Sequence, residues 1–248
     1  MSLIIAAAQP ASIPGDIQRN VARHLRFGAI AAERGVQLLV FPELSLTGYE
    51  LALARANAVR PDSPSLDPLR HLATSAHMTV VAGAPLLNGH DELYIAALAF
   101  RPDGSMSVYA KVYVHQSELH VFTPGLGGPM LQVGEANVAL AICADAKHPR
   151  HAARAASSGA NVYAVGAMIV EDEYAPKAAL LKNYALEHKM AVLLSNYSGV
   201  TGGWESAGKS ALWSEAGQLV AASTGTEEAL VVGTKQNGVW NGIVLSLS

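Results

Sequence analysis

Three side chains capable of acid, base or nucleophilic chemistry each stand at the end of an apolar run. Glu43, Lys111 and Cys143 directly follow Leu-Leu-Val-Phe-Pro, Val-Tyr-Ala and Val-Ala-Leu-Ala-Ile, respectively. Runs of this kind are typical of buried strands, and loops at the carboxyl ends of strands in α/β sheets converge on ligands. We therefore expect these three side chains to meet in one site.

The types of these residues fit nucleophilic catalysis by a thiol. A cysteine is mostly protonated at neutral pH and needs a base or a positive charge beside it. Burial would make Glu43 a better base, Lys111 would favour the thiolate, and Lys111 with backbone amides after Cys143 would stabilise an oxyanion. The inert alternatives are a cysteine that only packs in the core and charged residues that only face solvent.

The composition restricts the class of protein. The chain has 248 residues, of which 50% are hydrophobic and 15% charged, so we expect one domain over 1–248 with a large layered core. A net charge of -3 without a basic cluster argues against nucleic acid as a partner. The single cysteine excludes an internal disulfide and a multi-thiolate metal site. No apolar run is long enough for a bilayer, so we expect a cytoplasmic protein without a membrane partner.

Short apolar runs alternate with segments of helical periodicity along the chain, which predicts an α/β fold with mixed sheets covered by helices. Helices are expected from Asp16 to before Gly35 and at about 66–76, 150–158 and 175–189. A hairpin is expected over 93–111, with its turn at Pro102-Asp103-Gly104. The other expected strands are 3–8, 36–41, 78–84, 130–133, 138–142, 161–165, 191–195, 210–213 and 218–222.

Over nearly its whole length the sequence resembles the nitrilase superfamily of carbon-nitrogen hydrolases. The motifs that carry the resemblance are, in order, Phe41-Pro42-Glu43-Leu44 with Thr47-Gly48-Tyr49, Lys111 with Glu118 and Phe122-Thr123-Pro124-Gly125, and Ala141-Ile142-Cys143-Ala144-Asp145. Gln9, Gly159-Ala160-Asn161 and Gly208-Lys209-Ser210 match further family positions. The combination is specific, although each motif alone is weak.

The resemblance implies a four-layer α-β-β-α sandwich with two mixed β-sheets, frequently assembled into a homodimer. It implies Glu43 as general base, Lys111 as oxyanion lysine, Cys143 as nucleophile and Glu118 as a second carboxylate that orients the lysine and the substrate. The implied activity is cleavage of a small amide or carbamoyl substrate through a thioester, without a metal or an organic cofactor.

Two further positions are expected to line the substrate pocket. The backbone amide of Ala144 would join the oxyanion hole, and Tyr49 would face the thiol. Nitrile-hydrolysing members usually carry tryptophan and glutamate after the cysteine, so Ala144-Asp145 favours amides. Lys147 or Arg150 replaces an arginine that many relatives have in this segment.

Other mechanisms and functions are compatible with parts of the sequence. His148, His151 or His188 could pair with Cys143 as in papain-like proteases, and the first two histidines could hold zinc with it, although no fourth ligand is evident. A relative that binds ligands without catalysis, or one that transfers the acyl group to an amine, has to be distinguished by experiment.

Overall fold

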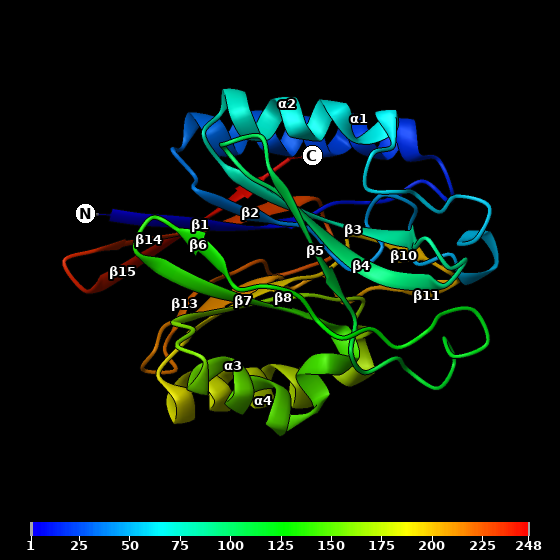
Figure 1. Cartoon of the computed structure of the whole chain (residues 1–248). Coiled ribbons are helices and arrows are strands. Elements are labelled where there is room, and N and C mark those ends of the chain that lie inside the picture. Colours follow the sequence, from blue (N-terminus) through cyan, green and yellow to red (C-terminus); the bar gives the residue numbers. More distant parts are fainter. Residues whose placement is uncertain (1, 248) are drawn as a thin grey trace.

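The computed structural model describes residues 2–247, and two β-sheets face each other in its centre (Figure 1). The seven-stranded sheet has the order β15-β14-β1-β2-β3-β4-β5. β1 is parallel to β2 and β2 to β3, while the other neighbours are antiparallel. Its strands are β1 (Ser2–Gln9), β2 (Leu38–Val40), β3 (Thr79–Leu87), β4 (Leu93–Phe100), β5 (Met106–Ala110), β14 (Ala229–Gln236) and β15 (Val239–Ser246).

The six-stranded sheet has the order β13-β12-β9-β8-β7-β6. β7, β8 and β9 are parallel to one another, and β6, β12 and β13 join them in antiparallel pairs. Its strands are β6 (Leu131–Val133), β7 (Ala136–Ile142), β8 (Val162–Gly166), β9 (Ala191–Ser195), β12 (Ala211–Trp213) and β13 (Leu219–Ala222). A separate short ribbon joins β10 (Val200–Thr201) and β11 (Trp204–Glu205).

Helices cover the outer face of each sheet (Figure 1). α1 (Ile17–Glu33) and α2 (Asp67–Ser75) pack on the seven-stranded sheet, and α3 (Pro149–Ser157) and α4 (Glu171–His188) pack on the six-stranded sheet. Short 3₁₀ segments are η1 (Leu51–Leu53), η2 (Pro64–Leu66) and η3 (Cys143–Lys147). The expected four-layer α-β-β-α sandwich with two mixed sheets is therefore confirmed. No helix within residues 2–247 is long and apolar enough to cross a membrane.

The first strand illustrates why the apolar runs lack alternation. Ile5 and Ala7 pack in the core between the two sheets, whereas Ala6 and Ala8 pack in the core beneath α1 and α2. Successive side chains of a strand point to opposite faces, so a strand in a middle layer buries both sets. At the end of this strand, buried Gln9 accepts hydrogen bonds from the Ser210 backbone and the Ser223 hydroxyl, which ties the two sheets together.

The structure differs from the sequence prediction in several elements, among them the short β10–β11 ribbon, which was not predicted. β2 is shorter than the predicted 36–41, and α4 begins at Glu171 instead of near 175, with Pro176 inside the helix. Three acidic residues in the first turn favour this earlier start. The terminal hairpin of β14 and β15 was not predicted, because Asn241-Gly242 within β15 and its partly exposed side chains weaken the strand pattern.

Candidate active site

The three strand-end residues come from both sheets and meet between them. Glu43 follows β2 and Lys111 follows β5 in the seven-stranded sheet, whereas Cys143 follows β7 in the six-stranded sheet. The predicted positions at strand ends are correct. The sequence did not indicate that two different sheets supply these residues.

Lys111 connects two buried carboxylates at the centre of the site. Its ammonium Nζ donates to Glu43 Oε1 at 2.5 Å and to both oxygens of Glu118 at 2.9 and 2.8 Å. The three side chains are at most 1% exposed. The second oxygen of Glu118 also accepts a backbone hydrogen bond from His115 at 2.7 Å, which fixes the loop that carries it. The structure thus brings Glu43, Lys111 and Glu118 together as one hydrogen-bonded group.

Tyr49 belongs to the same group of side chains. Its hydroxyl donates to Glu118 Oε1 at 2.7 Å. Burial and the nearby carboxylates hold the pKa of Tyr49 well above its usual value, so the hydroxyl stays protonated and can only donate to this carboxylate. Tyr49 therefore helps to fix Glu118, in addition to any contact with substrate.

The backbone around Glu43 passes very close to two strands. A Cβ atom on Gly83 of β3 would lie 2.3 Å from the Pro42 carbonyl oxygen, and one on Gly166 of β8 would lie 2.7 Å from the Phe41 carbonyl oxygen. Only glycine permits such an approach. The buried Tyr197 hydroxyl also donates to the Glu43 carbonyl at 2.6 Å, so the segment is held from several directions.

The charges at the site perturb one another. Burial raises the pKa of Glu43 to about 7, although Lys111 opposes this rise. Burial alone would lower the pKa of Lys111, but the negative charges of Glu43 and Glu118 outweigh it and hold the pKa above its usual value. At neutral pH Lys111 is therefore a cation, while Glu43 is divided between its ionised and neutral forms.

The thiol of Cys143 is harder to ionise than the sequence led us to expect. Burial and the charge of Glu43 raise its pKa to about 12, and the lowering effect of Lys111 does not offset them. The thiol contacts the Met168 carbonyl at 3.7 Å, and its interaction with Glu43 lowers the pKa of that carboxyl group. Glu43 Oε2 is buried and has no hydrogen-bond partner among the described residues, which leaves it free to accept a proton.

Cys143 is the first residue of η3 and directly follows the last residue of β7. Its φ of 40° lies in the left-handed region, which residues with a side chain rarely adopt. Backbone conformations of this kind cost free energy and often occur at functional positions. The backbone amide of Ala144, which is buried, comes directly after this residue.

None of the three histidines considered as partners of Cys143 forms a hydrogen bond with it in the part of the chain described here. His148 stacks on Tyr113 at 3.8 Å between ring centroids, and His188 stacks on Tyr184. Within residues 2–247, no group of three His, Cys, Asp or Glu side chains is arranged to hold a metal ion. The structure does not bring together the cysteine-histidine pair that the alternative mechanism requires.

Asp145 supports the site in a way that sequence reasoning missed. Its buried carboxylate accepts from the backbone N–H groups of Val112 at 3.1 Å and Tyr113 at 2.8 Å through Oδ1. Oδ2 accepts from the Ile142 backbone at 3.0 Å and the Tyr109 hydroxyl at 2.7 Å. The carboxylate thereby links the chain after Lys111 to the chain before Cys143. The only sequence signal was a charged residue two positions after the cysteine.

The cavities show where small molecules have room. Beside the thiol, a cavity of about 20 Å³ is lined by Cys143, Lys147 and Lys177 together with apolar side chains, and one of about 10 Å³ touches Glu43. Each holds about one water molecule, so a substrate at the thiol has to be compact or displace neighbouring side chains. Arg150, in contrast, lines a different cavity, which lies beside α3 and does not include Cys143 in its lining.

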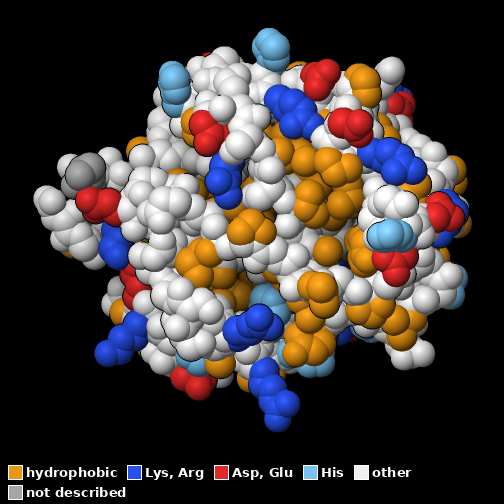
Figure 2. All heavy atoms as spheres, viewed as in Figure 1, with side chains coloured by type: hydrophobic (Ala, Val, Ile, Leu, Met, Phe, Trp, Pro, Cys, Tyr) orange, Lys and Arg blue, Asp and Glu red, His pale blue; other side chains and the backbone are white. Residues whose placement is uncertain are grey.

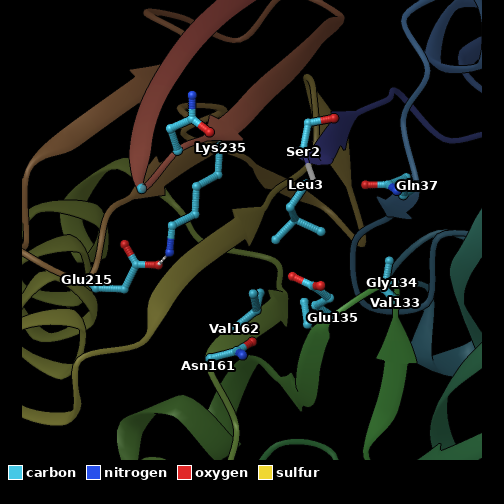
Figure 3. Close-up of a pocket in the computed structure, with 13 residues that line it drawn as sticks. Ser2, Leu3, Gln37, Val133, Gly134, Glu135, Asn161, Val162, Glu215 and Lys235 are labelled. Carbon is cyan, nitrogen blue, oxygen red and sulfur yellow. Dashed lines mark hydrogen bonds and ion pairs between the residues drawn. The ribbon is translucent and has the colours of Figure 1, made fainter.

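A cavity of about 460 Å³ lies at the opposite end of the sandwich, near the start of β1, β7 and β8 (Figure 3). None of the predicted site residues lines it. Figure 3 shows Lys235 and Glu215 facing each other at its wall, where they form an ion pair at 2.6 Å. This cavity is therefore separate from the thiol.

Comparison with known proteins places the chain in a family. The family model described as carbon-nitrogen hydrolase matches residues 4–240. A protein named nitrilase from Pyrococcus abyssi is 32% identical over 208 residues, which are 82% of this chain and 78% of that protein. The chain therefore belongs to the carbon-nitrogen hydrolases of the nitrilase superfamily.

Solved structures of an amidase from Nesterenkonia sp. AN1 share the fold. A mutant in complex with butyramide matches with a TM-score of 0.84 and 28% sequence identity, covering 93% of this chain and 89% of that chain. Another mutant, which shows Michael addition of acrylamide at the active site cysteine, matches with the same TM-score and identity over 93% and 92% of the two chains. In structure, the chain is close to an amidase.

Proposed function

We propose that the protein hydrolyses a small amide, with Cys143 as nucleophile. The observation that carries this proposal is the bridge from Lys111 to two buried carboxylates, one of which interacts with the Cys143 thiol. Support also comes from the Nesterenkonia amidase, whose structures include a butyramide complex and covalent adducts at the active site cysteine. The small cavities beside the thiol favour a compact acyl group.

In the first step Glu43 takes the thiol proton as sulfur attacks the carbonyl carbon. Because burial and the charge of Glu43 hold the pKa of Cys143 well above that of Glu43, full proton transfer before attack is unfavourable. Proton transfer therefore accompanies formation of the C–S bond, as in general base catalysis. Lys111 Nζ and the Ala144 amide stabilise the oxyanion of the tetrahedral intermediate.

The intermediate collapses when its C–N bond breaks. Glu43 returns the proton to the leaving nitrogen, so ammonia or an amine departs and a thioester with Cys143 is left. Glu43 then takes a proton from water as the water oxygen attacks the thioester carbon, and it returns that proton to sulfur as the C–S bond breaks. The products are a carboxylic acid and the regenerated thiol. Glu118 and Tyr49 hold Lys111 in position throughout.

Mass spectrometry of the intact protein tests the nucleophile. We expect short incubation with butyramide or acrylamide, followed by acid quench, to give an adduct on Cys143 and none in Cys143→Ala. With butyramide, Glu43→Gln should accumulate less acyl adduct and show no turnover. Equal ammonia release by wild type and Cys143→Ala, in proteins with the same melting temperature, would overturn the assignment.

A matched set of amides and nitriles of equal chain length tests the choice of substrate. We expect ammonia release from amides to exceed that from nitriles. The reason is that Ala144-Asp145 stands where nitrile-hydrolysing members usually have tryptophan and glutamate. Turnover of nitriles alone would contradict the amide assignment. Binding of every compound without turnover would favour the non-catalytic alternative, and formation of a hydroxamate with added hydroxylamine would reveal acyl transfer. Homodimerisation and a cytoplasmic location stay predictions.

A further inference from the structure

A second pocket lies on the other side of the Asp145 network from the thiol. It has a volume of about 340 Å³ and is lined by α3, the end of β5 and the loop that contains Leu126 and Gly127. Pockets of this size hold small organic ligands. On the face shown in Figure 2 the surface is hollowed above α3, with apolar side chains around the hollow and histidine and basic side chains beside it.

Two arginines give the lining of this pocket a positive charge. Arg150 and Arg154, one helical turn apart on α3, both line it, and no aspartate or glutamate does. Among residues 2–247, no hydrogen bond or ion pair joins either guanidinium to another side chain. Like charges four residues apart on a helix repel each other. This pair stands out in a chain whose net charge is -3.

The position of Arg150 in the helix adds to this imbalance. Arg150 is the second residue of α3, and the first turn contains no acidic residue. The amino end of a helix carries partial positive charge, so a cation there is unfavourable and an anion is favourable. An anion between the two guanidinium groups would relieve both unfavourable interactions.

The inner wall of the pocket is apolar and already saturated in its hydrogen bonds. Val112, Met130 and Leu140 supply aliphatic surface. The Tyr109 hydroxyl donates to Asp145 and lies 2.7 Å from His151 Nε2, and His151 Nδ1 lies 2.8 Å from the Tyr163 hydroxyl. These polar groups are therefore satisfied within the protein. A ligand meets positive charge at the rim and apolar surface inside.

We propose that this pocket binds a small organic oxyanion, a carboxylate or phosphate with a compact apolar body, whose anionic group pairs with Arg150 and Arg154. Guanidinium groups bind both oxyanions through paired N–H donors. The apolar body packs against the inner wall formed by Val112, Met130 and Leu140. The proposal concerns a site separate from Cys143 and does not depend on the proposed reaction.

Thermal unfolding of the full chain at low ionic strength tests this site. Benzoate and phenyl phosphate carry both features, acetate and inorganic phosphate lack the apolar body, and benzyl alcohol lacks the charge. We expect benzoate or phenyl phosphate to raise Tm by about 2 to 4 °C at several times Kd, a larger shift than the smaller anions give. A shift with only one of the two identifies a carboxylate or a phosphate as the preferred group.

The arginine variants decide whether the shift comes from this pocket. In the double variant Arg150→Gln/Arg154→Gln the ligand shift should vanish, and each single variant should reduce it. Arg19→Gln is the matched control, because Arg19 is also exposed in the first turn of a helix. Absence of a shift with both aromatic anions, an undiminished shift in the double variant, or an equal shift with benzyl alcohol would overturn the proposal.

Discussion

Replacing Asp145 by asparagine should test whether its carboxylate holds the active site together. The carboxylate accepts four hydrogen bonds, three from backbone N–H groups and one from Tyr109. Asparagine keeps one acceptor oxygen, so its NH₂ group faces two of these donors. Two lost hydrogen bonds to a charged acceptor, at about 1.5 to 3 kcal/mol each, give a destabilisation of about 3 to 6 kcal/mol.

The lower end of this range applies if the Tyr109 hydroxyl turns and accepts from the new NH₂ group, which leaves the Ile142 N–H without an acceptor. Because typical proteins unfold at a cost of about 5 to 15 kcal/mol, such a loss is easily measured by urea denaturation. We also expect kcat to fall at least about tenfold under conditions where the variant is folded, since a small displacement of Lys111 or Cys143 disturbs the reaction geometry.

Asp62→Asn is the control for this experiment, because Asp62 is exposed in a turn, and we expect its denaturation midpoint to be unchanged. A destabilisation by Asp145→Asn below about 1 kcal/mol, with unaltered kcat, would refute the role that we assign to the carboxylate.

Four other predictions concern the group around the thiol. Because Glu43 has to be ionised to accept a proton and its pKa is about 7, we expect kcat/KM to fall below that pH; an acid limb centred near pH 4.5, the ordinary value, would contradict this. The same raised pKa means that the folded state favours protonated Glu43, so its contribution to stability should be lost as pH rises from about 4.5 to about 7, and Glu43→Gln should remove this dependence in urea denaturation. Alkylation of Cys143 by iodoacetamide should be slow at pH 7, accelerate as pH rises, and be slower still in Lys111→Met, because the ammonium favours the thiolate; equal rates in both proteins would show that Lys111 does not act on the thiol. Gly166→Ala should lower kcat more than KM rises, since its Cβ would lie 2.7 Å from the Phe41 carbonyl and displace Glu43; unchanged kinetics would show that the segment adjusts freely.

Local patterns in the sequence predicted much of the fold. The buried runs before Glu43, Lys111 and Cys143 form β2, β5 and β7, and the Pro102-Asp103-Gly104 turn lies between β4 and β5 as expected. These features depend on residues close together in the chain. Together with the family motifs, they were enough to predict which four side chains to examine and the four-layer arrangement.

Features that depend on long-range packing were not predictable in the same way. The hydrogen bond from Tyr109 to Asp145 joins residues 36 positions apart in the sequence. The hydrogen bond from Tyr197 to the Glu43 carbonyl joins residues 154 positions apart. The pKa of Cys143 was expected to fall beside Lys111, but it rises because burial and Glu43 prevail. Sequence spacing identifies neighbours along a strand, whereas the depth of burial depends on how the whole sandwich closes.

The origin of the proposed catalytic groups on opposite sheets predicts that the packing between the sheets affects activity. Facing sheets pack about 10 Å apart, and this spacing sets how far Glu43 and Lys111 have to reach toward Cys143. Small side chains such as Ala7, Ala97 and Ala164 occupy the core between the sheets. A larger side chain at one of these positions would increase the distance between the sheets. Glu43 and Cys143 would then be less well placed for proton transfer. We therefore expect substitutions in the core between the sheets to change the reaction rate even when every proposed catalytic residue stays the same.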